Sequence, residues 1–141
     1  MHGQGPDHAQ HFAYASNLNR KQMAERCPDS QPKFKATLPN HKLIFAGWSR
    51  TWHGATASIK PFQGNKVVGG VYEISERDLG SLDKHEGCPA VYSRVSKRVI
   101  TEDGDLMEVV TYVMQQQSEE SRPSREYLAI VQQGYRDWGI I

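Results

Sequence analysis

The segment Leu82-Asp83-Lys84-His85-Glu86-Gly87 carries two carboxylates that could exchange protons with a bound ligand. A glutamate that is partly buried beside aromatic groups such as Tyr92 becomes an effective acid/base, because burial raises its pKa toward neutrality. Position alone does not select Glu86, since the chain has nine glutamates and most glutamates are solvated surface charges. Asp83 is the rival carboxylate, although its side chain could equally interact with nearby backbone or cationic groups.

A second candidate site is the segment Phe12-Ala13-Tyr14-Ala15-Ser16-Asn17-Leu18. It predicts a short aromatic strand followed by a turn into a helix over residues 18–26. Ser16 or Asn17 could cap that helix, because a short polar side chain accepts a hydrogen bond from a free N–H group. The other free N–H groups carry partial positive charge and form an anion site. Such turns occur in many folds, so this pattern alone identifies no ligand.

Other catalytic patterns are weak or absent in the sequence. It contains no phosphate-binding loop, His-Glu-x-x-His, Gly-x-Ser-x-Gly or dinucleotide fingerprint. Ser16, His53 and His85 could be imagined as part of a Ser/His/Asp set, but a histidine beside a tryptophan is more often a packed or hydrogen-bonded strand residue. The three tryptophans are expected in the core or in a pocket wall: Trp48, Trp52 and Trp138.

Residues 1–10 are predicted to form a disordered tail, because they are rich in Gly, His, Gln and Pro and show no apolar periodicity. Residues 11–141 fit a single domain. His2, His8 and His11 could hold a metal in principle, but irregular spacing in a mobile segment favours adventitious binding. No metal site is therefore predicted.

The charge and hydropathy of the chain disfavour several kinds of partner. Seventeen Lys and Arg oppose sixteen Asp and Glu, and the basic residues are scattered rather than clustered, so nucleic acid is not an expected partner. No apolar run approaches the roughly 20 residues of a membrane span, and the first residues lack the apolar centre of a signal peptide. A cytoplasmic protein is therefore expected, with Cys27 and Cys88 as free thiols rather than a disulfide. The sequence does not indicate an oligomeric state.

Strands with a two-residue period are predicted at residues 42–46, 55–59, 67–74, 91–100 and 107–114. Asp103-Gly104 predicts a tight turn that joins the last two strands as a hairpin. One short helix is predicted after the cap Ser75 and ends by Gly87; another begins after Ser124 and ends at Gly134. This pattern predicts an α+β fold, either a compact curled mixed sheet or a small β-barrel, with a few short flanking helices.

The two candidate segments share their order and spacing with a known family. Together with Thr51-Trp52-His53-Gly54 and Pro123-Ser124-Arg125-Glu126-Tyr127, they resemble the γ-glutamylcyclotransferase family over about residues 12 to 139. Four motifs in register are far more specific than any one of them.

The resemblance implies that the protein converts a γ-glutamyl amino acid or amine into 5-oxoproline and the free amine, with no cofactor and with a small-molecule substrate as its partner. It implies that Glu86 is the general acid/base. It also implies a substrate-binding set that comprises the turn after the first strand and two tyrosines: Tyr14, Ala15, Ser16, Asn17, Leu18, Tyr92 and Tyr127.

One residue departs from the family pattern. Ala15 occupies a position where the family usually has glycine, and a positive φ there would strain alanine by roughly 1–2 kcal/mol. We expect instead that close approach of the ligand explains the usual glycine. Two alternatives remain open: a dedicated enzyme that removes a γ-glutamyl group from one biosynthetic intermediate, and a non-catalytic binding or interaction domain, which the Ala15 replacement favours.

Overall fold

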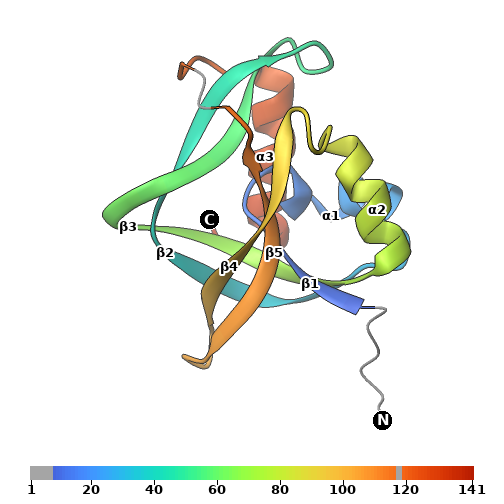
Figure 1. Ribbon diagram of the computed structural model, residues 1–141, viewed down its shortest axis with the longest axis vertical. Coiled ribbons are helices and arrows are strands. Elements are labelled where there is room, and N and C mark those ends of the chain that lie inside the picture. The colour runs from blue at the N-terminus through green and yellow to red at the C-terminus, as the bar shows by residue number, and fades with distance from the viewer. Residues whose placement is uncertain (1–7, 117–118) are drawn as a thin grey trace.

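Five strands close into a barrel in the computed structural model, which describes residues 8–116 and 119–141 (Figure 1). Around the barrel the strands follow the order β1-β3-β2-β4-β5. Neighbouring strands are antiparallel, except that β1 closes the barrel by pairing in parallel with β5. The strands are β1 (His8–Ala13), β2 (Gln31–Ser49), β3 (Gly54–Ser75), β4 (Tyr92–Thr101) and β5 (Leu106–Met114). The predicted α+β barrel with short helices is confirmed.

Strands β2 and β3 form a long hairpin of which the sequence predicted only parts. They are 19 and 22 residues long, and β3 runs without a break through residues 60–66, between two predicted strands. Residues 61–66 are exposed, so their side chains lack the apolar alternation that signals a strand. In β2, register shifts between Pro32 and Phe34 and between Pro39 and His41 accommodate prolines that cannot donate to the ladder.

Strand β1 begins at His8, which corrects the prediction that the disordered tail reaches residue 10 and that order begins at Phe12. Residues 8–10 are held by pairing with residues 73–75 of β3, and backbone pairing does not require apolar side chains. The rest of the predicted tail, including His2, lies outside the described residues. His11 is buried against Tyr72 and Tyr112, whereas His8 is exposed.

Short helices cover the barrel: the 3-10 turn η1 (Ser16–Leu18), α1 (Arg20–Arg26), α2 (Glu76–His85) and α3 (Arg125–Asp137). Ser75 caps α2, as predicted, and Ser124 caps α3; each hydroxyl accepts a hydrogen bond from the N–H group three residues later. The cap of α1 is Asn19, not the predicted Ser16 or Asn17. The intervening 3-10 turn shifts the start of α1.

Helix α3 continues past Gly134, where the sequence predicted its end. A Cβ atom on Gly134 would lie 2.6 Å from the backbone nitrogen of Asn19 and 2.8 Å from the Cβ atom of Leu18. Glycine at this position therefore serves the close approach of α3 to η1 rather than a helix stop.

Candidate active site

The segment between β1 and α1 contains one turn of 3-10 helix, η1, which is closed by two backbone hydrogen bonds. Leu18 N–H donates to the Ala15 carbonyl at 3.0 Å, and Asn19 N–H donates to the Ser16 carbonyl at 2.9 Å. These two bonds leave the N–H groups of Ser16 and Asn17 without a partner in the turn, as at the start of any helix. Two donors next to each other are thus available to a ligand.

Helix α3 and its C-cap residue Trp138 hold this turn in place. The indole N–H of Trp138 donates to the Leu18 carbonyl at 2.9 Å, and the Asn19 side-chain amide donates to the Ile130 carbonyl at 3.2 Å. The close contact at Gly134 lies between these two bonds along α3. The position of η1 is therefore set by residues more than 100 positions later in the chain.

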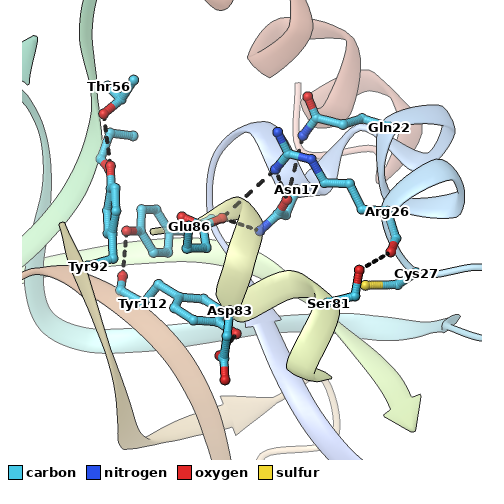
Figure 2. Close-up of polar contacts among 12 residues, drawn as sticks. Asn17, Gln22, Arg26, Cys27, Thr56, Ser81, Asp83, Glu86, Tyr92 and Tyr112 are labelled. Carbon is cyan, nitrogen blue, oxygen red and sulfur yellow. Dashed lines mark hydrogen bonds and ion pairs between the residues drawn. The ribbon is translucent and has the colours of Figure 1, made fainter. Parts of the chain in front are cut away.

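Glu86 lies at the C-terminal cap of α2 and directs its carboxylate toward this turn (Figure 2). Glu86 Oε2 accepts a hydrogen bond from Asn17 Nδ2 at 3.1 Å and lies 3.9 Å from Arg26 Nη1. The Glu86 side chain is 15 % exposed. Gly87 follows with a φ of +68°, a conformation that glycine adopts without strain and that ends the helix at this residue.

The Asn17 amide is oriented by helix α1. Its oxygen accepts from Arg26 Nη1 at 3.1 Å and from Gln22 Nε2 at 3.5 Å, which leaves its NH₂ group to face Glu86. Gln22 and Arg26 are four residues apart, so they project from the same face of α1. Figure 2 shows both side chains converging on Asn17 from α1. The carboxylate, the amide and the guanidinium form one network.

The environment of Glu86 raises its pKa above the ordinary value. Burial is the largest cause, because a carboxylate loses hydration when it is partly removed from water. The Arg26 charge and the Asn17 hydrogen bond act in the opposite direction, and the negative charge of Asp83 raises the pKa further. The pKa of Glu86 is thus raised toward neutral pH, although Arg26 and Asn17 still stabilise its ionised form.

Tyrosines line the rest of the pocket and stay neutral. Tyr92 OH donates to the Ala57 carbonyl at 2.6 Å, and Tyr127 OH accepts from the Ala57 N–H group at 2.9 Å. Tyr14 OH donates to the Tyr112 carbonyl at 2.6 Å. Burial raises the pKa of each of these phenols, that of Tyr127 to about 12.

Burial has the opposite effect on the histidine in this pocket. It lowers the pKa of His11 to about 4, so the imidazole is neutral at physiological pH. Burial thus shifts the pKa of His11 and of the tyrosines away from neutral pH. Among the titratable groups that line the inner pocket, Glu86 is the one whose pKa is shifted toward neutral pH.

The structure brings six of the seven predicted binding residues together with Glu86 around this inner pocket: Tyr14, Ala15, Ser16, Asn17, Tyr92 and Tyr127. Leu18 is the exception, because its side chain is fully buried in the core and its N–H group is bonded within the turn. The inner pocket, about 40 Å³, shares four lining residues with a neighbouring cleft of about 620 Å³: Ser16, Glu86, Tyr92 and Tyr127.

The rival groups have other surroundings. Asp83 accepts a hydrogen bond from Tyr112 OH at 2.5 Å and pairs with Arg94 at 3.4 Å, so structural partners engage its carboxylate. His53 is exposed, with a φ of +56°, in the turn between β2 and β3, which corrects the expectation of a packed strand residue. His85 is exposed at the end of α2.

Arg26 and Gln22 are site residues that the sequence reasoning did not single out. The available signal was their spacing of four residues on a predicted helix directly after the turn. That signal shows that the two side chains share a face, but it does not show that the face meets Asn17.

Ala15 has a φ of −143°, outside the left-handed region. The explanation of the usual glycine by a positive φ is therefore excluded for this chain, and the alanine is not strained on that account. Ala15 is buried and lines the inner pocket.

Comparison with known proteins places the chain in a family. Residues 11–135 match the model of the family described as gamma-glutamyl cyclotransferase, AIG2-like. The chain belongs to this family. It is 32 % identical to human gamma-glutamylcyclotransferase over 96 % of this chain and 76 % of that protein. It is 28 % identical to bovine gamma-glutamylaminecyclotransferase over 48 % of this chain and 52 % of that protein.

A solved structure of a gamma-glutamyl cyclotransferase shares the fold. The TM-score is 0.90, with 30 % sequence identity over 95 % of this chain and 82 % of that chain.

Within residues 8–116 and 119–141, no cluster of His, Cys, Asp and Glu is placed to hold a metal ion. In the same part of the chain, no helix has the length and hydropathy needed to cross a bilayer.

Proposed function

We propose that this protein closes the γ-glutamyl group of an amino acid or amine conjugate into 5-oxoproline and releases the free amine, with Glu86 as the acid/base. Membership of the cyclotransferase family supports the reaction. The observation that carries the role of Glu86 is its position: a partly buried carboxylate with a raised pKa, opposite the free N–H groups of the β1–α1 turn.

The substrate supplies its own nucleophile in this reaction. Its α-amino group can reach its own γ-carbonyl through an unstrained five-membered ring, and holding the chain folded back gives effective molarities of ~10⁵–10⁸ M in well-oriented cases. The α-amino group has a pKa of ~7.7–8.0 and is mostly protonated at neutral pH. The enzyme must therefore remove one proton before attack.

Glu86 would carry that proton through both halves of the reaction. Its carboxylate accepts the proton from the ammonium group, and the free amine attacks the γ-carbonyl carbon to give a tetrahedral intermediate. The protonated Glu86 then donates to the departing nitrogen as the original C–N bond breaks. The ring nitrogen carries two protons after the attack, and it passes one of them through the same carboxylate to the released amine, which leaves as an ammonium ion. The Glu86 carboxylate is thereby regenerated, and the enzyme gains or loses no net proton.

The β1–α1 turn would bind the negatively charged parts of the substrate. The N–H groups of Ser16 and Asn17 can hold either the α-carboxylate or the developing oxyanion, since both are anionic oxygens. Tyr127 and Tyr92 complete the wall at the junction with the larger cleft. Their neutral hydroxyls are held by Ala57, so these side chains are positioned before substrate arrives.

The decisive experiment replaces Glu86 by glutamine and measures released 5-oxoproline from a panel of γ-glutamyl compounds. We expect Glu86→Gln to lower kcat by at least ~10²-fold with substrate binding largely kept, because an amide preserves shape but cannot carry the proton. Asp83→Asn tests the rival carboxylate, and Glu25→Gln on the exposed face of α1 controls for loss of charge. Wild-type turnover by Glu86→Gln would end its assignment.

The two alternative functions give different results in the same assay. A non-catalytic domain would release no 5-oxoproline from any compound. The feature in its favour is the replacement of the family's usual glycine by Ala15, whose φ of −143° lies outside the left-handed region. A dedicated enzyme for one biosynthetic intermediate would turn over few members of the panel. Broad turnover supports a general cyclotransferase.

We also propose that the protein acts in the cytoplasm. Cys27 and Cys88 are both free, which fits a reducing compartment. Fractionation of cells that express the tagged chain would test the location.

A further inference from the structure

The geometry points to the large cleft outside the inner pocket as the subsite for the leaving group, and to an apolar α-amino acid with a free carboxylate as the group that fits it. This inference rests on the proposed reaction, because only that reaction puts a departing amine beside Glu86.

The cleft is continuous with the place where the scissile bond would break. Ser16, Glu86, Tyr92 and Tyr127 line both the inner pocket and the cleft. The inner pocket has a volume of about 40 Å³, whereas the cleft has about 620 Å³. A nitrogen that receives its proton from Glu86 lies at this junction, so whatever is attached to that nitrogen extends into the cleft.

Apart from Glu86, the charged side chains that line the cleft are basic. Arg26 comes from α1, Arg50 from the turn between β2 and β3, and Lys84 from the end of α2. Among the described residues that line the cleft, Glu86 is the one acidic residue, and it accepts a hydrogen bond from Asn17. Arg50 and Lys84 are exposed at the cleft. A carboxylate is attracted to this surface, and a second ammonium group is repelled.

Apolar side chains form the rest of the cleft wall and are exposed there. Trp48, predicted as core or pocket wall, is 73 % exposed and belongs to the cleft wall. Val91, in the loop between α2 and β4, is 57 % exposed. Trp52 packs edge-on against Tyr127, with ring centroids 5.4 Å apart, and extends this surface down to the inner pocket.

Large apolar side chains are left exposed mainly where they meet a ligand or a partner. Here they flank the same opening as the cations. The combination fits one leaving group that is both anionic and apolar, which describes an α-amino acid such as phenylalanine better than a diamine or a lysine side chain.

The test uses four conjugates that differ only in the leaving amine: γ-glutamyl-phenylalanine, γ-glutamyl-phenylalaninamide, γ-glutamyl-alanine and γ-glutamyl-putrescine. We expect wild-type kcat/KM to be highest for the phenylalanine conjugate. The double variant Arg50→Gln/Lys84→Gln should lower kcat/KM for that conjugate about 3- to 20-fold, mainly through KM, and leave the amide conjugate within about two-fold. Trp48→Ala should reduce the preference for phenylalanine over alanine about 3- to 10-fold.

Arg98→Gln, an exposed cation on β4 that does not line the cleft, is the matched control and should change none of these ratios. Equal turnover of all four conjugates, or a preference for the putrescine conjugate, would overturn the subsite and leave the cyclisation reaction intact. Absence of 5-oxoproline from every conjugate would instead mean that the proposed reaction fails.

Discussion

The inner pocket and the outer cleft are built in opposite ways. In the inner pocket the polar side chains are buried and bonded to the backbone: Tyr14 to Tyr112, and Tyr92 and Tyr127 to Ala57. In the outer cleft the distinctive side chains, Trp48, Arg50 and Lys84, are exposed.

This difference matches a substrate with one constant half and one variable half. Every substrate of the proposed reaction has the same γ-glutamyl group. A pocket whose side chains are already fixed can be complementary to that group, because those side chains need not become ordered during the reaction. A leaving amine differs from substrate to substrate, and exposed side chains can change during evolution without destabilising the core. We therefore expect changes in the inner pocket to alter kcat and stability, and changes at the exposed cleft residues Trp48, Arg50 and Lys84 to alter only the choice of substrate.

Among substitutions that act on the support of the inner pocket, the largest effect is expected from Gly134→Ala. The added Cβ atom would lie 2.6 Å from the Asn19 backbone nitrogen, so α3 and the β1–α1 turn must separate. We expect a loss of about 1–3 kcal/mol in the free energy of unfolding, and a fall of more than ~10-fold in kcat/KM because Asn17 moves away from Glu86. Urea denaturation and the 5-oxoproline assay measure the two effects.

Gly80→Ala is the matched control, since Gly80 also lies in a helix but has no atom within 4 Å of an added Cβ. Its change should leave activity intact and stabilise the helix by up to ~1 kcal/mol. If Gly134→Ala were equally harmless, the turn would not depend on α3.

A smaller effect is expected from Arg26→Met, which removes the cation nearest Glu86. Because the Arg26 charge lowers the pKa of Glu86, its loss should raise that pKa. The acidic limb of the kcat/KM profile reports ionisation of the base in the free enzyme, so it should move to higher pH, with a several-fold loss at slightly acidic pH.

Arg20→Met provides the comparison for that profile. Arg20 is on the same helix, but its guanidinium stacks over Trp138 at 4.7 Å and does not enter the network. Its profile should match that of the wild type. An unmoved acidic limb in Arg26→Met would indicate that the base is not Glu86 or that Arg26 does not act on it.

The smallest effect is expected from Ala15→Gly. Since the φ of Ala15 is −143°, glycine relieves no left-handed strain, and the more flexible unfolded chain should cost about 0.4–1 kcal/mol of stability. We expect kcat/KM for γ-glutamyl-alanine to change less than about two-fold. A gain in stability on thermal denaturation would contradict this account of Ala15.

Several local features of the fold, such as helix caps and a tight turn, could be predicted from the sequence. Ser75 and Ser124 cap helices as their side chains predict, and the Asp103-Gly104 turn joins β4 to β5. The two motif segments also converge as expected, with Glu86 facing Asn17. In each case the determinant is a short-range hydrogen bond or a turn conformation encoded within a few residues, or a motif whose arrangement the family resemblance supplied.

Features that depend on contacts between distant segments could not be predicted from the sequence. Nothing near Gly134 shows that a backbone more than 100 positions earlier will pack against it, so the residue was interpreted as a helix stop. Likewise, Arg26 meets Asn17 only because α1 folds back over the turn. The exposed middle of β3 was missed because solvent on both sides removes the apolar alternation.

The attachment of η1 to α3 also sets the order in which the site can be assembled. Trp138, Gly134 and Ile130 all support a turn that is made from residues 16–19. During synthesis the turn emerges early and its support emerges more than a hundred residues later. The protein can therefore acquire a competent site only after residue 138 has left the ribosome, and a truncation before α3 would leave Glu86 facing an unsupported loop.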